Sequence, residues 1–253
     1  EPGDVFDKLG GSLNAMLTRI DELMTGLRTV TDSLAHDMRM PLTRLKGALS
    51  RAGDPNVPEG ERFDAISQAQ AEADHALATF SALIDIARAE SGLSEEMMQE
   101  TDISGLAAEV ADLFSPVLED AGQQLTVLVP QTAVMGRVHP VLLRQAIGNL
   151  LHNAAKYAGA DARVSLSVEP PKDGFVRIVV ADTGPGIPAE SRGIVPQRFV
   201  KLDPARHSPG SGLGLAIVAA CAKLHRGQLL LEDNRPGLRA ILALKFPAPF
   251  KSA

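Results

Sequence analysis

A heptad pattern over residues 6–34 constrains the fold of this chain more than any other feature. Apolar side chains recur there at alternating intervals of three and four residues, which places them along one seam of a supercoiled helix. The surrounding positions are polar, so the pattern favours a coiled coil or parallel bundle over an ordinary amphipathic helix. The seam consists of Phe6, Leu9, Leu13, Met16, Ile20, Leu23, Leu27, Val30 and Leu34.

A second amphipathic helix is expected after the turn-forming residues 53–60, which are rich in Gly and Pro. Its apolar positions run from Phe63 to Ala87, and the residues Ser91 and Gly92 are expected to end it. Two long helices joined by a short loop form a hairpin, and a lone hairpin cannot bury its apolar seam. We therefore expect two copies of the chain to pair into a four-helix bundle.

The pattern changes near Thr101, where helical segments begin to alternate with short β-like runs. This alternation predicts an α/β sandwich with helices on one face of a mixed sheet. The domain boundary is expected between residues 91 and 101. The expected helices span residues 103–121, 141–157 and 213–224, and the expected strands span residues 125–129, 164–168, 175–181, 228–232 and 239–246.

Composition excludes several classes of protein. A hydrophobic content of 45% over 253 residues supports a real core, and a net charge of −6 argues against a nucleic-acid binder. The single cysteine, Cys221, cannot form an intrachain disulfide and is expected to be a core thiol. No apolar run approaches the roughly 18 residues of a membrane span, and a reducing, cytosolic setting is expected.

A histidine follows directly after the heptad seam. His36 falls outside the seam that ends at Leu34, so its ring is expected to face solvent, where a neutral ring nitrogen is nucleophilic near neutral pH. Asp37 can hold the other ring N–H, although adjacent helical side chains do not face each other. Pro41 clashes with the carbonyl of Asp37 and is expected to kink the helix.

Three motifs of the second region have the chemistry of a nucleotide site. Asn149, Asn153 and the pair Lys156–Tyr157 share one helix face, where amides suit Mg²⁺ and a lysine suits phosphate. The alternative for this motif is a polar helix edge. Residues 182–187 place a carboxylate and glycines after an apolar strand, and this carboxylate can accept from the amine of adenine. The alternative here is an ordinary turn.

The third motif, residues 210–215, places glycines before a helix, whose N–H groups suit phosphate. The motif lacks the last glycine of a dinucleotide-binding fingerprint, and it lacks the lysine of a P-loop. Residues 188–209, which separate the two glycine motifs, are rich in Pro, Gly and Arg and are expected to form a mobile lid.

Together, the histidine and the three motifs resemble those of bacterial sensor histidine kinases over nearly the whole chain. The resemblance implies an α+β fold: a helical-hairpin dimerisation domain, a four-helix bundle as a dimer, precedes an α/β-sandwich ATP-binding domain of the histidine kinase and gyrase type. The implied domains are a HAMP-like signalling helix at 1–30, a dimerisation and histidine phosphotransfer hairpin at 31–95, and the catalytic ATP-binding domain at 101–250.

The resemblance also implies a role for each site residue. His36 would accept the phosphoryl group, with Asp37 handling its proton, and would pass it to an aspartate of a response regulator. Asn153 would bind Mg²⁺, and Asp182 would read the adenine amine. The other residues implied around ATP are Asn149, Lys156, Tyr157, Gly184, Gly186, Gly212, Leu213 and Gly214.

The partners implied are a second copy of the chain and a response-regulator receiver domain, with no nucleic acid. The chain would be a cytoplasmic fragment, linked to the bacterial inner membrane only through a missing N-terminal segment. For the phosphate to reach His36, the linker near residues 91–101 is expected to flex. Whether the phosphate goes to the same subunit or its twin depends on the handedness of the hairpin loop.

Two positions depart from the family pattern. Met40 stands where members that dephosphorylate their partner carry Thr, Ser or Asn, and a thioether cannot donate a hydrogen bond. Pro196 stands where the family's lid has a first phenylalanine, leaving Phe199 alone. The alternative functions are a gyrase-like ATPase or conformational switch without phosphotransfer, which leaves His36 without a role, and a scaffold that binds no nucleotide.

Overall fold

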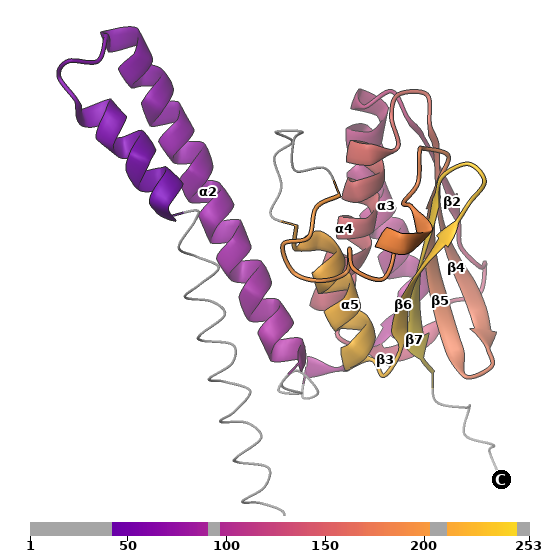
Figure 1. Cartoon of the computed structure of the whole chain (residues 1–253). Helices are drawn as coiled ribbons and strands as arrows, with labels where there is room; N and C mark the ends of the chain where they lie inside the picture. The colour runs from indigo at the N-terminus through magenta and orange to yellow at the C-terminus, as the bar shows by residue number, and fades with distance from the viewer. Residues whose placement is uncertain (1–41, 91–96, 203–211, 247–253) are drawn as a thin grey trace, which may run out of the picture. The chain divides into compact units, whose positions relative to one another are not determined.

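The computed structural model describes residues 42–90, 97–202 and 212–246. The chain divides into two compact units, Glu1–Ala87 and Arg88–Ala253. The described part is helical in the first unit and mixes helices with a sheet in the second (Figure 1), which confirms the α+β class. The heptad seam, His36, Asp37, Met40 and Pro41 lie outside the described residues.

The first unit contains the expected helical hairpin. A helix over residues 42–53 is followed by a short loop and by α2, which spans Glu59–Glu90. In the loop, Asp54 Oδ1 accepts a hydrogen bond from the Asn56 N–H at 2.9 Å, which is a side-chain turn. Arg62 Nε donates to the Ala52 carbonyl at 3.0 Å and so ties the start of α2 to the end of the first helix.

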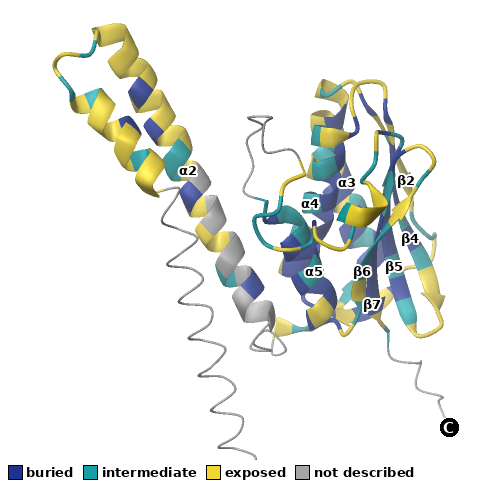
Figure 2. Cartoon of the chain, viewed as in Figure 1, coloured by how far each residue is buried: buried dark blue, intermediate teal, exposed yellow. Residues whose placement is uncertain are grey.

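The interior of the hairpin is built from small side chains. Ala48, Ala65 and Ala69 are buried, and no large side chain is needed where the two helices approach closely. Several larger apolar side chains of the same helices remain exposed, as the mostly yellow hairpin of Figure 2 shows, whereas Ile86 near the end of α2 is buried. The exposed ones are Leu42, Leu49, Phe63, Ile66, Leu77 and Phe80, with 43–65% of their surface exposed.

The second unit is a two-layer sandwich. Its main sheet has the strand order β2-β4-β5-β7-β6, in which only the β2–β4 pair is parallel. The three helices α3, α4 and α5 cover one face of this sheet (Figure 1), and the dark blue residues of Figure 2 lie between the layers. The elements are α3 (Ile103–Asp120), β2 (Gln124–Leu128), α4 (Pro140–Tyr157), β4 (Arg163–Lys172), β5 (Phe175–Asp182), α5 (Gly214–Leu224), β6 (Gln228–Asp233) and β7 (Leu238–Lys245).

All three expected helices and all five expected strands of this unit are confirmed, but the expected linker is partly wrong. Residues Gln99–Asp102 form β1, which pairs antiparallel with β3 at Met135–Val138. Each strand has four residues, too few to show a period of two in the sequence. The C-terminal end of the expected flexible linker is therefore part of the second unit.

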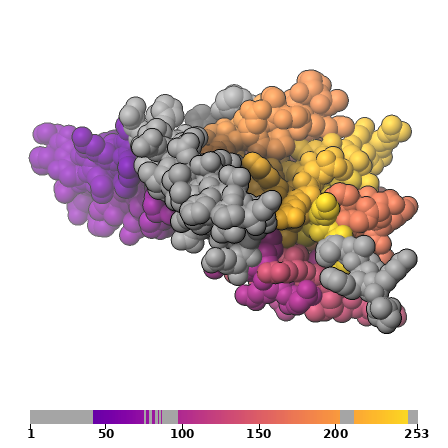
Figure 3. Space-filling view, turned by 90° about the horizontal axis from the view of Figure 1, so that it is seen from below, coloured from indigo at the N-terminus to yellow at the C-terminus, as the bar shows by residue number. Residues whose placement is uncertain are grey.

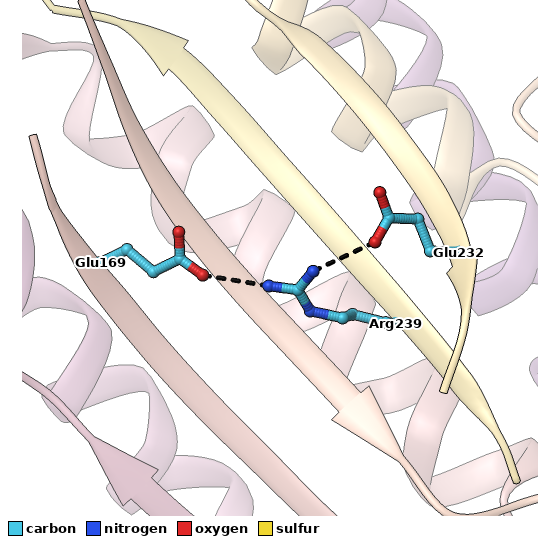
Figure 4. A network of polar contacts seen from close by, with 3 residues as sticks. All are labelled: Glu169, Glu232 and Arg239. Atoms are coloured by element: carbon cyan, nitrogen blue, oxygen red, sulfur yellow. Dashed lines mark hydrogen bonds and ion pairs between the residues drawn. The ribbon is translucent and has the colours of Figure 1, made fainter. Parts of the chain in front are cut away.

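On the face away from the helices, Arg239 links three strands. Its guanidinium donates to Glu169 on β4 and to Glu232 on β6, both at 3.0 Å (Figure 4). Arg239 pairs with Ala181 of β5, and this small side chain leaves room for the arginine to reach across β5. All three side chains are partly exposed, so each ion pair contributes about 0.2–1 kcal/mol.

A buried histidine pair joins the start of α4 to the end of α5. His225 Nε2 accepts from the His139 backbone N–H at 3.0 Å, and its Nδ1 donates to the Cys221 carbonyl at 2.7 Å. This arrangement requires a neutral His225 ring. Burial lowers the pKa of His225 and His139 lowers it further, while the bond to Cys221 acts in the opposite direction. Cys221 is buried, as expected, and burial raises its thiol pKa.

We predict that the free energy of unfolding falls as the pH drops below about 6.5, the pKa of histidine in an unfolded chain. Below this pH, His225 binds a proton in the unfolded chain but not in the folded one. The free energy of unfolding therefore falls by at most about 1.4 kcal/mol for each pH unit. Urea unfolding of His225→Gln between about pH 7.5 and 5.5 should show a shallower fall. The exposed His152→Gln is the control and should keep the full fall.

Candidate functional site

The first motif lies on α4, whose ends are fixed by the local sequence. His139 Nδ1 caps the helix by accepting from the Leu142 N–H at 3.2 Å, and Pro140 occupies the first helical position. Asn149 and Asn153 are half-buried on this helix. The Asn149 amide donates to the Gln145 carbonyl at 2.9 Å, which fixes the direction of its side-chain oxygen.

The amide oxygens of α4 face the glycine that begins α5. A Cβ added to Gly214 would lie 3.0 Å from Asn149 Oδ1 and 3.7 Å from Asn153 Oδ1. The absence of a side chain at Gly214 therefore lets the backbone of the second glycine motif approach both amides. The structure thus brings together Asn149, Asn153 and Gly214, three of the residues that the family resemblance implies around ATP.

The end of α4 carries the remaining residues of the first motif. Lys156 Nζ lies 5.1 Å from the centre of the Tyr157 ring, within the range of a cation–π interaction. The Tyr157 side chain is 55% exposed, so it presents an aromatic face to solvent. An exposed aromatic ring beside a cation is suited to contact a phosphorylated ligand.

Asp182 is a buried carboxylate at the end of β5, with 8% of its surface exposed. Its Oδ1 accepts from the Gly184 N–H at 2.8 Å and from the Leu238 N–H at 3.3 Å. These two donors hold the plane of the carboxylate in place. A carboxylate has acceptor positions on both oxygens, so it can accept a further hydrogen bond from a ligand.

Three glycines around Asp182 allow backbone segments to touch. A Cβ on Gly184 would lie 2.5 Å from Ala158 Cα, just beyond the end of α4. A Cβ on Gly186 would lie 2.7 Å from the Gly237 carbonyl oxygen, and one on Gly237 would lie 1.8 Å from the Asp182 carbonyl oxygen. In Figure 3 the orange segment after Asp182 lies beside the yellow C-terminal strands.

The β6–β7 turn supplies site residues that sequence reasoning missed. Asn234 Nδ2 donates to the Asp182 carbonyl at 2.7 Å, and the Asn234 N–H donates to the Gly237 carbonyl at 3.0 Å. Gly237 has φ +114, a conformation that favours glycine. Asn, Pro and Gly in this segment signal a turn, but no local signal places the turn against a residue so far away in the sequence.

Part of the expected lid is described. A 3₁₀ helix spans Ala189–Ser191, and the Arg192 side chain donates to the Ile187 carbonyl at 2.8 Å. Phe199 has φ +62, and its N–H donates to the Gly212 carbonyl at 3.0 Å. A Cβ on Gly212 would lie 2.9 Å from the Phe199 backbone. Phe199 therefore joins the first part of the expected lid to the second glycine motif; residues 203–211 lie outside the description.

The described residues of the site fit a metal ion that brings ligands of its own. Within the described residues, no group of three or more His, Cys, Asp and Glu side chains is placed to bind a metal. Asn153 offers a neutral amide oxygen, which suits a Mg²⁺ ion that is already bound to phosphate oxygens. The donor set therefore fits a metal that arrives with a nucleotide.

No helix of the described segments has the length and apolar character of a membrane span.

Comparisons with known proteins support the sequence resemblance. Residues 27–92 match the His Kinase A (phospho-acceptor) domain, and residues 138–249 match the Histidine kinase-, DNA gyrase B-, and HSP90-like ATPase family. Sensor protein IrlS of Burkholderia pseudomallei is 33% identical over 239 residues, which are 94% of this chain and 50% of IrlS. Sensor histidine kinase CpxA of Escherichia coli is 32% identical over 245 residues, covering 94% of this chain and 51% of CpxA.

A solved structure supports the same family resemblance. The mycobacterial sensor histidine kinase MprB is 29% identical with a TM-score of 0.51, and the match covers 58% of this chain and 97% of that chain. These matches confirm the resemblance drawn from the motifs. The chain spans about half the length of the curated relatives it matches.

We predict that Gly184→Ala destabilises the protein, because its Cβ would overlap the Ala158 backbone, which cannot move as a side chain can. The expected loss in urea unfolding is about 1–3 kcal/mol, the usual cost of overpacking. Gly193→Ala is the matched control, since a Cβ there meets no atom within 4 Å. Equal stability of the two variants would contradict the close contact.

Proposed function

Because the chain belongs to the family of bacterial sensor histidine kinases, we propose that it uses Mg-ATP to phosphorylate its own His36 and then transfers the phosphoryl group to an aspartate of a response regulator. Residues 31–95 form the dimerisation and phosphotransfer domain in this proposal, and residues 101–250 form the ATP-binding domain. Residues 1–30 form a signalling helix.

The observation that carries the proposal is the convergence of three separate motifs at one end of the sandwich. Gly214 lies against Asn149 and Asn153, and Gly184 lies against the end of the same helix, α4. These contacts gather amide oxygens, a buried carboxylate and glycine backbone. Each of the three is a group that recognises a different part of a nucleotide.

Each part of ATP has a proposed partner. The exocyclic amine of adenine donates to Asp182, which two backbone N–H groups already orient. Asn153 would hold a Mg²⁺ ion that arrives with ATP and would neutralise phosphate charge, and Asn149 lies on the same face of α4. Lys156 neutralises phosphate charge and Tyr157 borders the site. Gly184, Gly186, Gly212, Leu213 and Gly214 let the backbone approach the base and the phosphates.

The proposed transfer is an in-line displacement. The lone pair of a neutral His36 ring nitrogen forms a bond to the γ-phosphorus while the bond from that phosphorus to the β–γ bridging oxygen breaks, and its electron pair leaves with ADP. Asp37 accepts a hydrogen bond from the other ring N–H and stabilises the positive charge that the ring gains. Positioning of the two reactants by the protein, together with the charge neutralisation that a bound Mg²⁺ would supply, would provide most of the rate enhancement.

The exposed apolar side chains of the hairpin support a homodimer. Phe63, Leu77 and Phe80 are between 43% and 65% exposed on α2, while the alanines between the two helices are buried. Large apolar side chains that one copy leaves exposed are buried when a second hairpin packs against them. We propose the four-helix bundle of a dimer as this arrangement.

The setting in the cell is proposed from the relatives. The chain spans about half of each curated relative, so we propose that it is the cytoplasmic kinase part of a longer sensor protein of the inner membrane. Met40 cannot donate a hydrogen bond to orient a water molecule. We therefore propose that phosphatase activity toward the response regulator is weak or absent.

We predict that His36→Gln abolishes labelling by γ-³²P-ATP and leaves the Kd for Mg-ATP unchanged, because the nucleophile and the nucleotide site lie on different domains. The label on the wild-type protein should be labile in acid and stable in alkali, as a phosphorylated imidazole is. His75→Gln, another histidine of the hairpin, is the control and should retain the label. A label that survives His36→Gln would contradict the proposed acceptor.

We predict that Asp182→Asn weakens ATP binding by about 100-fold. The asparagine oxygen would turn toward the Gly184 and Leu238 N–H groups, so its NH₂ would face the adenine amine, donor against donor. Inosine triphosphate, which carries an acceptor at that position, should lose much less affinity. Calorimetric titration with both nucleotides measures this change.

Asp173→Asn is the matched control for this experiment. Asp173 is exposed in the β4–β5 turn at φ +54, a conformation that asparagine tolerates. It should bind both nucleotides as the wild type does. An Asp182→Asn variant with the wild-type preference for ATP would contradict the role of Asp182.

A further inference from the structure

Gln123 is a buried polar residue that none of the sequence motifs includes. It lies between α3 and β2, and only 3% of its surface is exposed. Its backbone N–H donates to the Leu118 carbonyl at 2.8 Å and so closes the end of α3. On either side, Asp161 N–H donates to the Gly122 carbonyl and Gln124 N–H donates to the Ala162 carbonyl. The position of its side chain is therefore tightly fixed.

The side-chain amide of Gln123 is directed at the last turn of α4. Nε2 donates to the carbonyl oxygens of Ala154 at 3.3 Å, Ala155 at 3.1 Å and Gly159 at 2.9 Å. Carbonyls at the end of a helix lack partners within the helix, and they carry the negative end of its dipole. Ala154 and Ala155 belong to the last turn of α4, where the Ala154 carbonyl also accepts from the Ala158 N–H, and Gly159 lies just beyond the helix. A donor shared among these three carbonyls holds the end of α4 in place.

The orientation of the amide follows from its surroundings. If the amide were flipped, the oxygen would face three carbonyl oxygens. In the observed orientation, Oε1 is buried and has no hydrogen-bond partner within the described residues. An unpaired buried oxygen is unfavourable, so an apolar residue of the same size would avoid this cost. The hydrogen bonds that the NH₂ group donates are therefore what a glutamine adds at this position.

These hydrogen bonds matter because of what the last turn of α4 carries. Asn153, Lys156 and Tyr157 belong to this turn, and Ala158 just beyond it is the surface on which Gly184 packs. A shift of this turn would move the metal ligand, the lysine and the glycine motif beside Asp182 together. A displacement of about 1 Å at such groups is enough to weaken a site severely.

We infer that Gln123 is a positioning residue for nucleotide binding, which acts by donating to the carbonyls at the C-terminus of α4. The inference rests on the proposed function, because it concerns the same nucleotide site. Gln123 touches no ligand in this account. Its effect reaches the nucleotide through the backbone of residues 154–159.

The test compares Gln123→Met with the wild-type 253-residue chain. Methionine has a similar length and no donor. We expect the Kd for Mg-ATP to rise about tenfold, while the rate of His36 phosphorylation at saturating ATP changes less than about twofold. Equilibrium dialysis gives the Kd, and a labelling time course gives the rate. The melting temperature without nucleotide is recorded for every variant.

Ser104→Ala is the matched control for a loss of stability alone. Ser104 is also buried, and its hydroxyl accepts from the Val134 N–H at 3.3 Å near the start of α3. This variant should lower the melting temperature and leave the Kd for Mg-ATP unchanged. A merely structural role for Gln123 predicts the same result for Gln123→Met.

Gln123→Glu provides a second, reversible test. At about pH 8 its carboxylate would face carbonyl oxygens and weaken ATP binding further. Burial and these carbonyls raise the pKa of that carboxyl, so lowering the pH to about 6 favours the protonated form, which donates one O–H. The ratio of the variant's Kd for Mg-ATP to the wild-type Kd at the same pH should then fall toward one, whereas the ratio for Gln123→Met should not change.

The outcomes separate the two proposals. A folded Gln123→Met with the wild-type Kd, or a Gln123→Glu without recovery at low pH, would overturn the role of Gln123. If Gln123→Met does not fold, the pH series of Gln123→Glu decides. Failure of the wild-type chain itself to bind Mg-ATP would overturn the proposed function instead.

Discussion

The nucleotide end of the sandwich depends on direct contact between backbone segments. Gly184 rests on Ala158, Gly186 on Gly237, and Gly237 on Asp182, at distances that leave no room for a Cβ. Contacts of this kind cannot be adjusted by a change of rotamer, because no side chain is present to move. They hold the end of α4, the end of β5 and the β6–β7 turn against one another. These contacts therefore fix the positions of the polar groups of the site.

The sequence predicts well those features of the sandwich that depend on local signals. The helical pattern marks α4, the apolar runs mark the five strands of the main sheet, and the glycines mark turns; all of these signals are local. The contribution of Asn234 and Gln123 is not predictable in the same way. Each binds a backbone group 31–52 residues away, and only the closed sandwich brings the partners together. The strands β1 and β3 are not predicted from the sequence for another reason, because four residues are too few to show an alternating pattern.

The two units satisfy different stability requirements. The sandwich buries large side chains such as Leu143, Ile178 and Leu242 completely between its own layers. The hairpin buries mainly alanines between its helices and leaves Phe63 and Leu77 exposed, which suits the homodimer proposed for it. We propose that the hairpin is held within a dimer while the sandwich, which buries its own core, is free to change its position. That freedom is what an enzyme requires when its phosphoacceptor and its nucleotide lie on different domains.

Among the described residues of the sandwich, the buried polar side chains lie at the ends of helices and strands. Ser104, Gln123, His139 and His225 exchange hydrogen bonds with backbone groups there, and each does so as a neutral group or is required to be neutral by its partners. Asp182 is the exception, because it is the one carboxylate in this set. Its two backbone donors would be satisfied equally by the oxygen of an asparagine, without the cost of burying a charge. The fold therefore does not require the carboxylate, whereas the contact with the adenine amine that we propose for Asp182 does.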